Sequence, residues 1–207
     1  MPRFDTRLAL MRAAEQLFAQ QGVDRVSLRE IAIAAGQRNV SAATYHFGSK
    51  RELIEAILER HTLPIQETWR PVLAVEHQQD FSLERLLELV VRPLVDKIDD
   101  ADGGRSYLEL CAELVASRSF PLMGMRVAST PVANDLTRRI AERGPEVPPM
   151  VRVLRSTRMA GMIYSSIGDY LRLSANGVEI PREVFVSDLV HALAGTARAP
   201  APTVGPE

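Results

Sequence analysis

Residues 36–50, GQRNVSAATYHFGSK, bring several chemically reactive side chains close together in the sequence. Ser41, His46 and Lys50 are of types that serve as nucleophile, proton carrier or electrostatic stabiliser in active sites. Such a site also needs a carboxylate that orients the histidine and a glycine-rich loop that binds an oxyanion. The sequence offers neither, so a surface that binds a negatively charged partner is the better interpretation.

The histidines and the single cysteine do not form a metal-binding pattern. His46, His61, His77 and His191 lack ligand spacing with Cys111 or with a carboxylate pair. A phosphate-binding loop and a dinucleotide-binding fingerprint are also absent from the sequence. We therefore expect a protein that is not an enzyme and that uses no metal and no cofactor.

The composition is that of a soluble globular protein, with 46% apolar and 25% charged residues among 207. No apolar run approaches the roughly 18 residues of a membrane span, and the charged N-terminus does not resemble a secretory signal. Cys111 has no partner for a disulfide, so we expect a cytoplasmic protein. The net charge is −1, but residues 1–60 hold nine Lys/Arg against seven Asp/Glu, which permits a nucleic-acid partner.

The elements that must position the 36–50 stretch are helices, because apolar residues recur at helical spacing and no strand-like alternation is sustained. Ser27 and Glu30 have capping-box spacing, which predicts a helix start. Ser49 and Glu52 repeat this spacing before another helix. Asn39 is the expected cap of a short helix between them. The predicted helices cover residues 5–21, 28–35, 40–47 and 50–60.

The later helices are longer and less clearly bounded. Pro64 and Pro71 are expected to interrupt the segment that contains Trp69, because proline cannot donate to the helical hydrogen-bond ladder. Ser82 and Thr130 are expected N-caps. The predicted helices cover residues 83–98, 107–117, 131–143, 150–174 and 182–194.

The short helix over 40–47 has two distinct faces when its residues are placed 100° apart. The side predicted to pack on the other helices carries Val40, Ala43, Thr44 and Phe47. The side predicted to face outward carries Ser41, Ala42, Tyr45 and His46. Small outward residues allow a helix to approach a surface closely, which favours a docking role.

Cations lie at the start of successive helices. Lys50 and Arg51 follow the Ser49 cap, where the helix dipole disfavours positive charge, and Arg29 occupies the first turn of the second helix. Free backbone N–H groups and a lysine at one helix start form a good phosphate site. A helix, a glycine-containing turn and a second short helix make a helix-turn-helix, whose second helix enters the DNA major groove.

The run SLREIAIAAG…TYHFGSKREL resembles the N-terminal domain of the TetR family of bacterial transcriptional regulators, over roughly residues 7–60. The stretch from Gly36 to Phe47 is one position longer than the family pattern, because residues 37–39 fill the turn. For this reason Asn39, rather than Ser41, is expected at the capping position.

The resemblance implies DNA-binding residues. Tyr45, His46 and Lys50 match the phosphate-contacting end of the family motif, whereas Arg38, Asn39, Ser41 and Ala42 fall at the base-facing end. The full predicted DNA-binding set is Arg29, Arg38, Asn39, Ser41, Ala42, Thr44, Tyr45, His46 and Lys50.

The remainder of the chain matches the family in helical character and length. Apolar side chains there can line a ligand cavity or pack in an ordinary core. The candidate ligand-binding residues are Trp69, Val90, Leu108, Cys111, Met123 and Met125. Gly161, Ser165, Ser166 and Gly168 are small residues that allow close helix approach, in a core or across a dimer interface. The family implies dimerisation through the helices at about 150–174 and 182–194.

The predicted fold is all-α, with an N-terminal three-helix helix-turn-helix domain and a larger C-terminal helical ligand-binding and dimerisation domain. The predicted domains are 1–48, with a linking helix at 50–61, then 62–195, followed by a disordered tail at 196–207. The predicted function is a ligand-responsive transcriptional repressor that binds a palindromic DNA operator as a homodimer and responds to a small apolar or amphipathic effector. The alternative is an all-helical protein-interaction adaptor that does not bind DNA.

Overall fold

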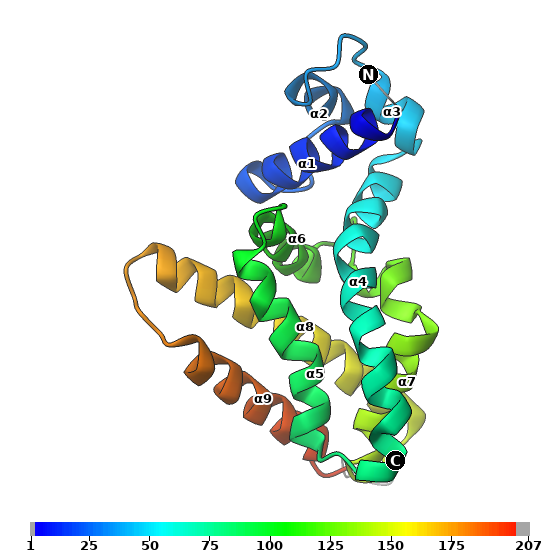
Figure 1. Ribbon diagram of the computed structural model, residues 1–207, viewed down its shortest axis with the longest axis vertical. Coiled ribbons are helices and arrows are strands. Elements are labelled where there is room, and N and C mark those ends of the chain that lie inside the picture. The colour runs from blue at the N-terminus through cyan, green and yellow to red at the C-terminus, as the bar shows by residue number, and fades with distance from the viewer. Residues whose placement is uncertain (1–2, 202–207) are drawn as a thin grey trace, which may run out of the picture. The chain divides into compact units, whose positions relative to one another are not determined.

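The computed structural model describes residues 3–201, apart from the side chains of residues 3–5, 76–79 and 128. Within this range the regular secondary structure is helical throughout and contains no strand, which confirms the all-α prediction (Figure 1). The α-helices are α1 Arg3–Gln21, α2 Leu28–Ala34, α3 Ala42–Phe47, α4 Lys50–Gln79, α5 Leu83–Asp96, α6 Gly104–Ala116, α7 Pro131–Glu142, α8 Pro149–Ala175 and α9 Arg182–Arg198. Three short 3₁₀ helices are η1 Lys97–Asp99, η2 Leu122–Gly124 and η3 Arg126–Ser129.

The chain divides into two compact units, and the division falls within α4. Unit 1 comprises Met1–Ile65 and Asp96–Ala128, and unit 2 comprises Gln66–Val95 and Ser129–Glu207. The domain division at residues 48 and 62 remains a prediction. Helix α9 continues to Arg198, so helical structure extends into the predicted tail, whereas residues 202–207 lie outside the described residues.

Unit 1 is built around α1, which packs against α2, α3 and α6 (Figure 1). Leu10, Ala14 and Phe18 recur at helical spacing along α1 and are fully buried. Val26 and Ile31, which flank the start of α2, are also buried and fix the angle at which the chain enters that helix. The apolar spacing that predicted the first helix thus produces the core of this unit.

Local capping chemistry sets several helix starts as predicted. Ser27 accepts a hydrogen bond from the Glu30 N–H at 3.2 Å, and the Glu30 carboxylate accepts one from the Ser27 N–H at 2.7 Å. Ser49 and Glu52 repeat the first of these bonds at 3.2 Å. Thr130 caps α7 through the Ala133 N–H at 3.3 Å. These bonds satisfy N–H groups that have no partner within the helix.

The prediction that Pro64 and Pro71 interrupt the chain is wrong, because α4 is one continuous helix of 30 residues. Each proline removes a helical hydrogen bond, but burial of neighbouring apolar side chains outweighs this local preference. Trp69 illustrates the point within unit 2: its side chain is buried, and its indole N–H donates to the Leu89 carbonyl at 2.9 Å.

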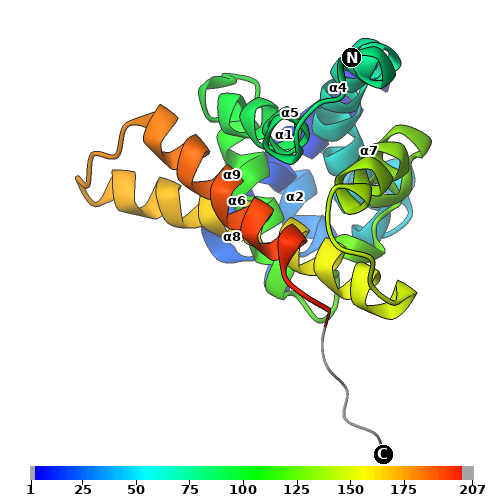
Figure 2. The same cartoon turned by 90° about the horizontal axis from the view of Figure 1, so that it is seen from below.

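Unit 2 contains α8 and α9, which lie side by side (Figure 2). Tyr170 of α8 and Phe185 of α9 stack with ring centroids 4.4 Å apart. The Arg155 guanidinium of α8 donates to backbone carbonyls at the end of α9, including that of Ala197 at 3.2 Å. The two helices are therefore joined at both ends of their contact.

Candidate nucleic-acid interface

The segment from α2 to α3 forms a helix, a tight turn and a second short helix. Gly36 has φ +68°, a left-handed conformation that glycine adopts without steric penalty, and it ends α2. The Gln37 N–H then donates to the Ala32 carbonyl at 2.9 Å, which closes the turn against the preceding helix. This arrangement presents α3 at the end of unit 1 (Figure 1).

Asn39 was predicted to cap α3, but it stabilises the turn before the helix instead. Its side-chain Oδ1 accepts a hydrogen bond from the Ser41 N–H at 2.9 Å, and its carbonyl accepts one from the Ala42 N–H at 3.0 Å. Ser41 occupies the N-cap position of α3 and makes no side-chain capping bond. The prediction that Asn39 replaces Ser41 as the cap is therefore wrong, although Asn39 does hold the turn that leads into the helix.

The buried face of α3 is rotated from the predicted one. Ala43 and Phe47 are buried as expected, but Ala42, which was expected to face outward, is also buried. Val40 and Thr44 were expected to face inward and are exposed. The helix begins at Ala42 rather than Val40, so Val40 belongs to the turn and does not follow helical periodicity.

The outward surface around α3, here called the α3 face, consists of Arg38, Val40, Ser41, Thr44 and Tyr45. Tyr45 is 74% exposed and makes an edge-on ring contact with half-buried His46, with centroids 5.3 Å apart. Its flat ring and hydroxyl extend from the helix into solvent.

Two arginines of the helix-turn-helix are free to bind a partner. Arg29 on α2 and Arg38 in the turn are exposed, and neither side chain makes a hydrogen bond or ion pair with the described part of the chain. By contrast, the guanidinium of Arg7 lies over the Phe47 ring at 4.7 Å and helps to hold α3. Unpaired guanidinium groups at a short exposed helix suit phosphate and base contacts.

Lys50, the predicted phosphate contact at the start of α4, already has partners inside unit 1. Its Nζ donates to the Val23 carbonyl at 2.9 Å and lies 5.8 Å from the centre of the Phe120 ring. The ammonium group thereby joins the α1–α2 turn to the beginning of α4. Sequence reasoning missed this contact because no local pattern links a lysine to a carbonyl so distant in the chain. Phosphate binding by Lys50 remains a prediction.

The six predicted ligand-binding residues divide between the two units. Trp69 and Val90 belong to unit 2, and the other four, Leu108, Cys111, Met123 and Met125, belong to unit 1. Within unit 1, Leu108 and Cys111 are fully buried in α6, and burial raises the pKa of the Cys111 thiol. Met125 is buried, whereas Met123 is 42% exposed. A ligand-binding role for any of them remains a prediction.

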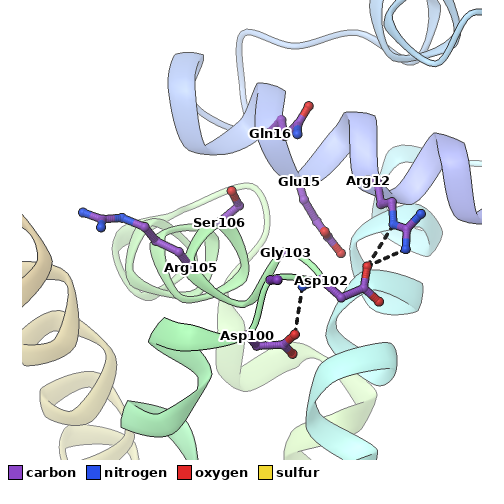
Figure 3. A pocket seen from close by; sticks show the side chains of 9 residues that line it. Arg12, Glu15, Gln16, Asp100, Asp102, Gly103, Arg105 and Ser106 are labelled. Carbon is purple, nitrogen blue, oxygen red and sulfur yellow. Dashed lines mark hydrogen bonds and ion pairs between the residues drawn. The ribbon is translucent and has the colours of Figure 1, made fainter.

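A polar pocket in unit 1, of about 350 Å³, was not predicted from the sequence (Figure 3). It lies between α1 and the loop before α6. Its lining includes Arg12, Glu15, Gln16, Asp100, Asp102 and Ser106. The lining comes from two stretches, residues 12–16 and 100–106, which are remote from each other in the sequence and share no motif. The sequence therefore held no signal that could have placed them together.

A network of charged groups fixes one wall of this pocket. The buried Glu15 carboxylate accepts from Arg60 Nη1 at 2.8 Å and lies 3.0 Å from His61 Nε2. Asp102 pairs with Arg60 and with Arg12, and these guanidinium groups lower the pKa of its carboxyl group. The second Glu15 oxygen, Oε2, is buried without a hydrogen-bond partner. Because a buried carboxylate is costly unless paired, Arg60 is essential to this arrangement.

Among the described residues, every helix is too short or too polar to span a lipid bilayer. No group of three or more His, Cys, Asp or Glu side chains there could hold a metal ion, and the side chain of His77 lies outside the described residues.

The fold and the α2–α3 geometry define a helix-turn-helix protein, and its N-terminal part is similar to known proteins. Residues 10–57 match the model described as bacterial regulatory proteins, tetR family. The regulator SrpR of Pseudomonas putida is 30% identical over 89 residues, covering 43% of this chain and 41% of SrpR. The repressor BepR of Brucella suis biovar 1 is 34% identical over 73 residues, covering 35% of this chain and 34% of BepR.

These matches show that residues 10–57 of this chain form an N-terminal domain of the TetR-family type. The matched segments span less than half the length of SrpR and of BepR. The solved structure of RolR in complex with resorcinol aligns over 98% of both chains, with a TM-score of 0.53 and 19% identity. The likeness to RolR extends the common fold to the C-terminal helices.

Proposed function

We propose that this protein is a DNA-binding transcription regulator that places α3 in the major groove. The observation that carries the proposal is a pair of exposed, unpaired arginines, Arg29 on α2 and Arg38 on the α3 face, in a TetR-family helix-turn-helix. In such motifs the second helix contacts base edges, and residues around it contact phosphates. Tyr45, with its exposed hydroxyl, is placed for a phosphate contact. The buried Ala42 supports the helix from behind rather than contacting bases.

The protein would bind a palindromic operator as a homodimer through α8 and α9. Val184, Asp188, His191 and Gly195 recur at helical spacing on α9, and all are exposed. Gly195 has open space where a side chain would project, since no atom lies within 4 Å of an added Cβ. Such a position allows a partner helix to approach closely.

On α8, Met150 and Leu154 are 77% and 48% exposed and share a face with Ser165. Gly168 is buried within unit 2, so it serves the core and not this surface. Exposed apolar residues on a helix beside α9 support an interface there, since water-exposed apolar patches often mark association sites.

A small apolar or amphipathic effector would control DNA binding. RolR, which shares the fold, has been solved with resorcinol. The candidate residues are taken within each unit by itself: Trp69 and Val90 in unit 2, and Leu108, Cys111, Met123 and Met125 in unit 1. The effector must bind one arrangement of the two DNA-reading helices more tightly than the other, or it shifts nothing. Release from DNA on binding would make the protein a repressor, the activity stated in the name of BepR.

DNA binding is tested by selecting duplexes from a random pool and then measuring affinity at several salt concentrations. Arg29→Ala and Arg38→Ala should each weaken binding and lower the salt slope by about one if each loses one phosphate contact. Arg38→Ala should also broaden the selected sequence if it reads a base. Arg118→Ala removes another exposed arginine of unit 1 and should behave as the native protein.

The adaptor alternative gives the opposite result. A protein that binds other proteins through the α3 face would enrich no duplex sequence, and any DNA binding would not depend on Arg29 or Arg38. That outcome would remove the proposed function.

The homodimer is tested at Gly195. Gly195→Leu should place a bulky side chain in the interface and yield monomers in analytical ultracentrifugation. Gly195→Ala adds little volume and favours the helix, so the dimer should persist. Equal association of both variants would show that Gly195 does not lie at a dimer interface.

A further inference from the structure

Val40 is an apolar residue held outward in the middle of the α3 face. It is 40% exposed and stands between exposed Arg38 and the exposed N-cap Ser41. The other aliphatic side chains of the α3 segment, Ala42 and Ala43, and the Phe47 ring are all packed inward. Packing within the chain therefore does not account for the type of side chain at this position.

The backbone around Val40 is fixed. Asn39 on one side bonds the Ser41 N–H through Oδ1 at 2.9 Å, and the Asn39 carbonyl accepts the Ala42 N–H at 3.0 Å. Valine is branched at Cβ and has restricted side-chain rotation. A partner that contacts Val40 thus meets a surface that loses little conformational freedom on binding.

We propose that Val40 contacts the C5-methyl group of a thymine in each operator half-site. The inference rests on the proposed function. In a helix-turn-helix the residues at the start of the second helix contact base edges, and Val40 directly precedes the N-cap of α3. Thymine presents the methyl group that distinguishes it in the major groove, and this group pairs with an apolar side chain.

The surroundings of Val40 favour DNA over another apolar partner. Unpaired Arg38 lies two residues before it and unpaired Arg29 lies on α2, and their charge complements a phosphate backbone. Asn39 is of the type that reads adenine through its amide, but its Oδ1 is already bound in the turn. An A·T pair at this position is therefore read from the thymine side, by Val40.

The test replaces one thymine at a time with deoxyuridine in a selected operator. This change deletes the methyl group and keeps the base pair. Burial of one such group corresponds to about a fourfold change in affinity, so the native protein should bind one substituted duplex about fourfold more weakly. The Val40→Ala variant should show no such loss at that thymine.

Val75→Ala is the matched control, because Val75 is 39% exposed and lies on α4 in unit 2. This variant should keep the native penalty for deoxyuridine. Both valines are exposed, so both variants should keep the native helical circular dichroism and urea midpoint.

The outcomes distinguish failure of the Val40–thymine contact from failure of the proposed DNA-binding function. If the native protein binds a selected duplex but no deoxyuridine substitution weakens that binding, the contact between Val40 and thymine is refuted and the proposed DNA-binding function is retained. The same holds if Val40→Ala retains the full penalty. If no duplex is selected or bound, the proposed function fails as well.

Discussion

The charged network of unit 1 can be probed through Gly103, an uncharged residue that lies against it. Gly103 has φ +89°, and a Cβ added there would lie 2.4 Å from Glu15 Oε2. An atom pair cannot remain that close, so Gly103→Ala must displace the Glu15 carboxylate. That carboxylate is held by Arg60 Nη1 at 2.8 Å and by His61 at 3.0 Å.

The destabilisation has two parts. The left-handed backbone costs an alanine roughly 1–2 kcal/mol, partly offset by the lower entropy of the unfolded chain. Loss of a hydrogen bond to the buried carboxylate adds roughly 1.5–3 kcal/mol. We therefore expect Gly103→Ala to reduce the free energy of unfolding by about 3–4 kcal/mol when both parts act together.

Gly36→Ala supplies the control for backbone strain. Gly36 also lies in unit 1 and has φ +68°, but an added Cβ meets no atom within 4 Å. It should lose about 1 kcal/mol. In a Glu15→Ala background the loss from Gly103→Ala should shrink to a similar value, since the clash is gone.

The assay is urea unfolding followed by circular dichroism at one fixed protomer concentration, because association would shift the midpoint. Equal losses for Gly103→Ala and Gly36→Ala would refute the reasoning. A full Gly103→Ala loss in the Glu15→Ala background would refute it too, since the clash would then have another cause.

Further predictions concern caps, reactivity and pH. Ser27→Ala should lower the free energy of unfolding by about 1 kcal/mol in a urea titration, because the α2 cap is lost. Ser187 is exposed in the middle of α9, so Ser187→Ala should leave that free energy nearly unchanged. Cys111 is fully buried and burial raises the pKa of its thiol, so a disulfide reagent at pH 8 should modify it in urea but not in the native protein; rapid native modification would contradict its burial. Burial also raises the pKa of Glu113 above its usual 4.5, so its contribution to stability is complete below that value and is lost as pH rises through the higher folded pKa. Glu113→Gln should remove that decline from a stability–pH profile while its amide oxygen still accepts the Val23 N–H; an unchanged profile would show that Glu113 does not titrate in this way.

The parts of the structure that depend on neighbouring residues were predictable. Ser27 with Glu30 and Thr130 with its proline determine helix starts through bonds within one turn, and a sequence pattern records them directly. The helix-turn-helix followed from such caps together with the glycine-ended α2.

The contacts that depend on distant residues were not predictable. The bond from Lys50 to the Val23 carbonyl and the grouping of Glu15 with Arg60 join segments that no local pattern relates. The continuous α4 was missed for the same reason. The local preference of Pro64 predicted a break in the helix. The helix continues because the rest of the fold buries apolar side chains on either side of this proline.

The orientation of the α3 face was predicted in part. Ala43 and Phe47 are buried as helical periodicity required, but the position of the first helical residue decides which side Val40 takes. Element boundaries are the least certain feature of a sequence reading, and a shift of two residues was enough to turn a supposed core valine outward.

The Asn39 turn has an evolutionary consequence. Asn39 and the buried residues Ala43 and Phe47 maintain the shape of the segment, whereas the side chains of Arg38 and Val40 are exposed. Surface positions of this kind accept substitution with little loss of stability. If Arg38 and Val40 read DNA as proposed, a duplicated copy of such a protein could acquire a different target sequence through single changes at these two positions and still fold.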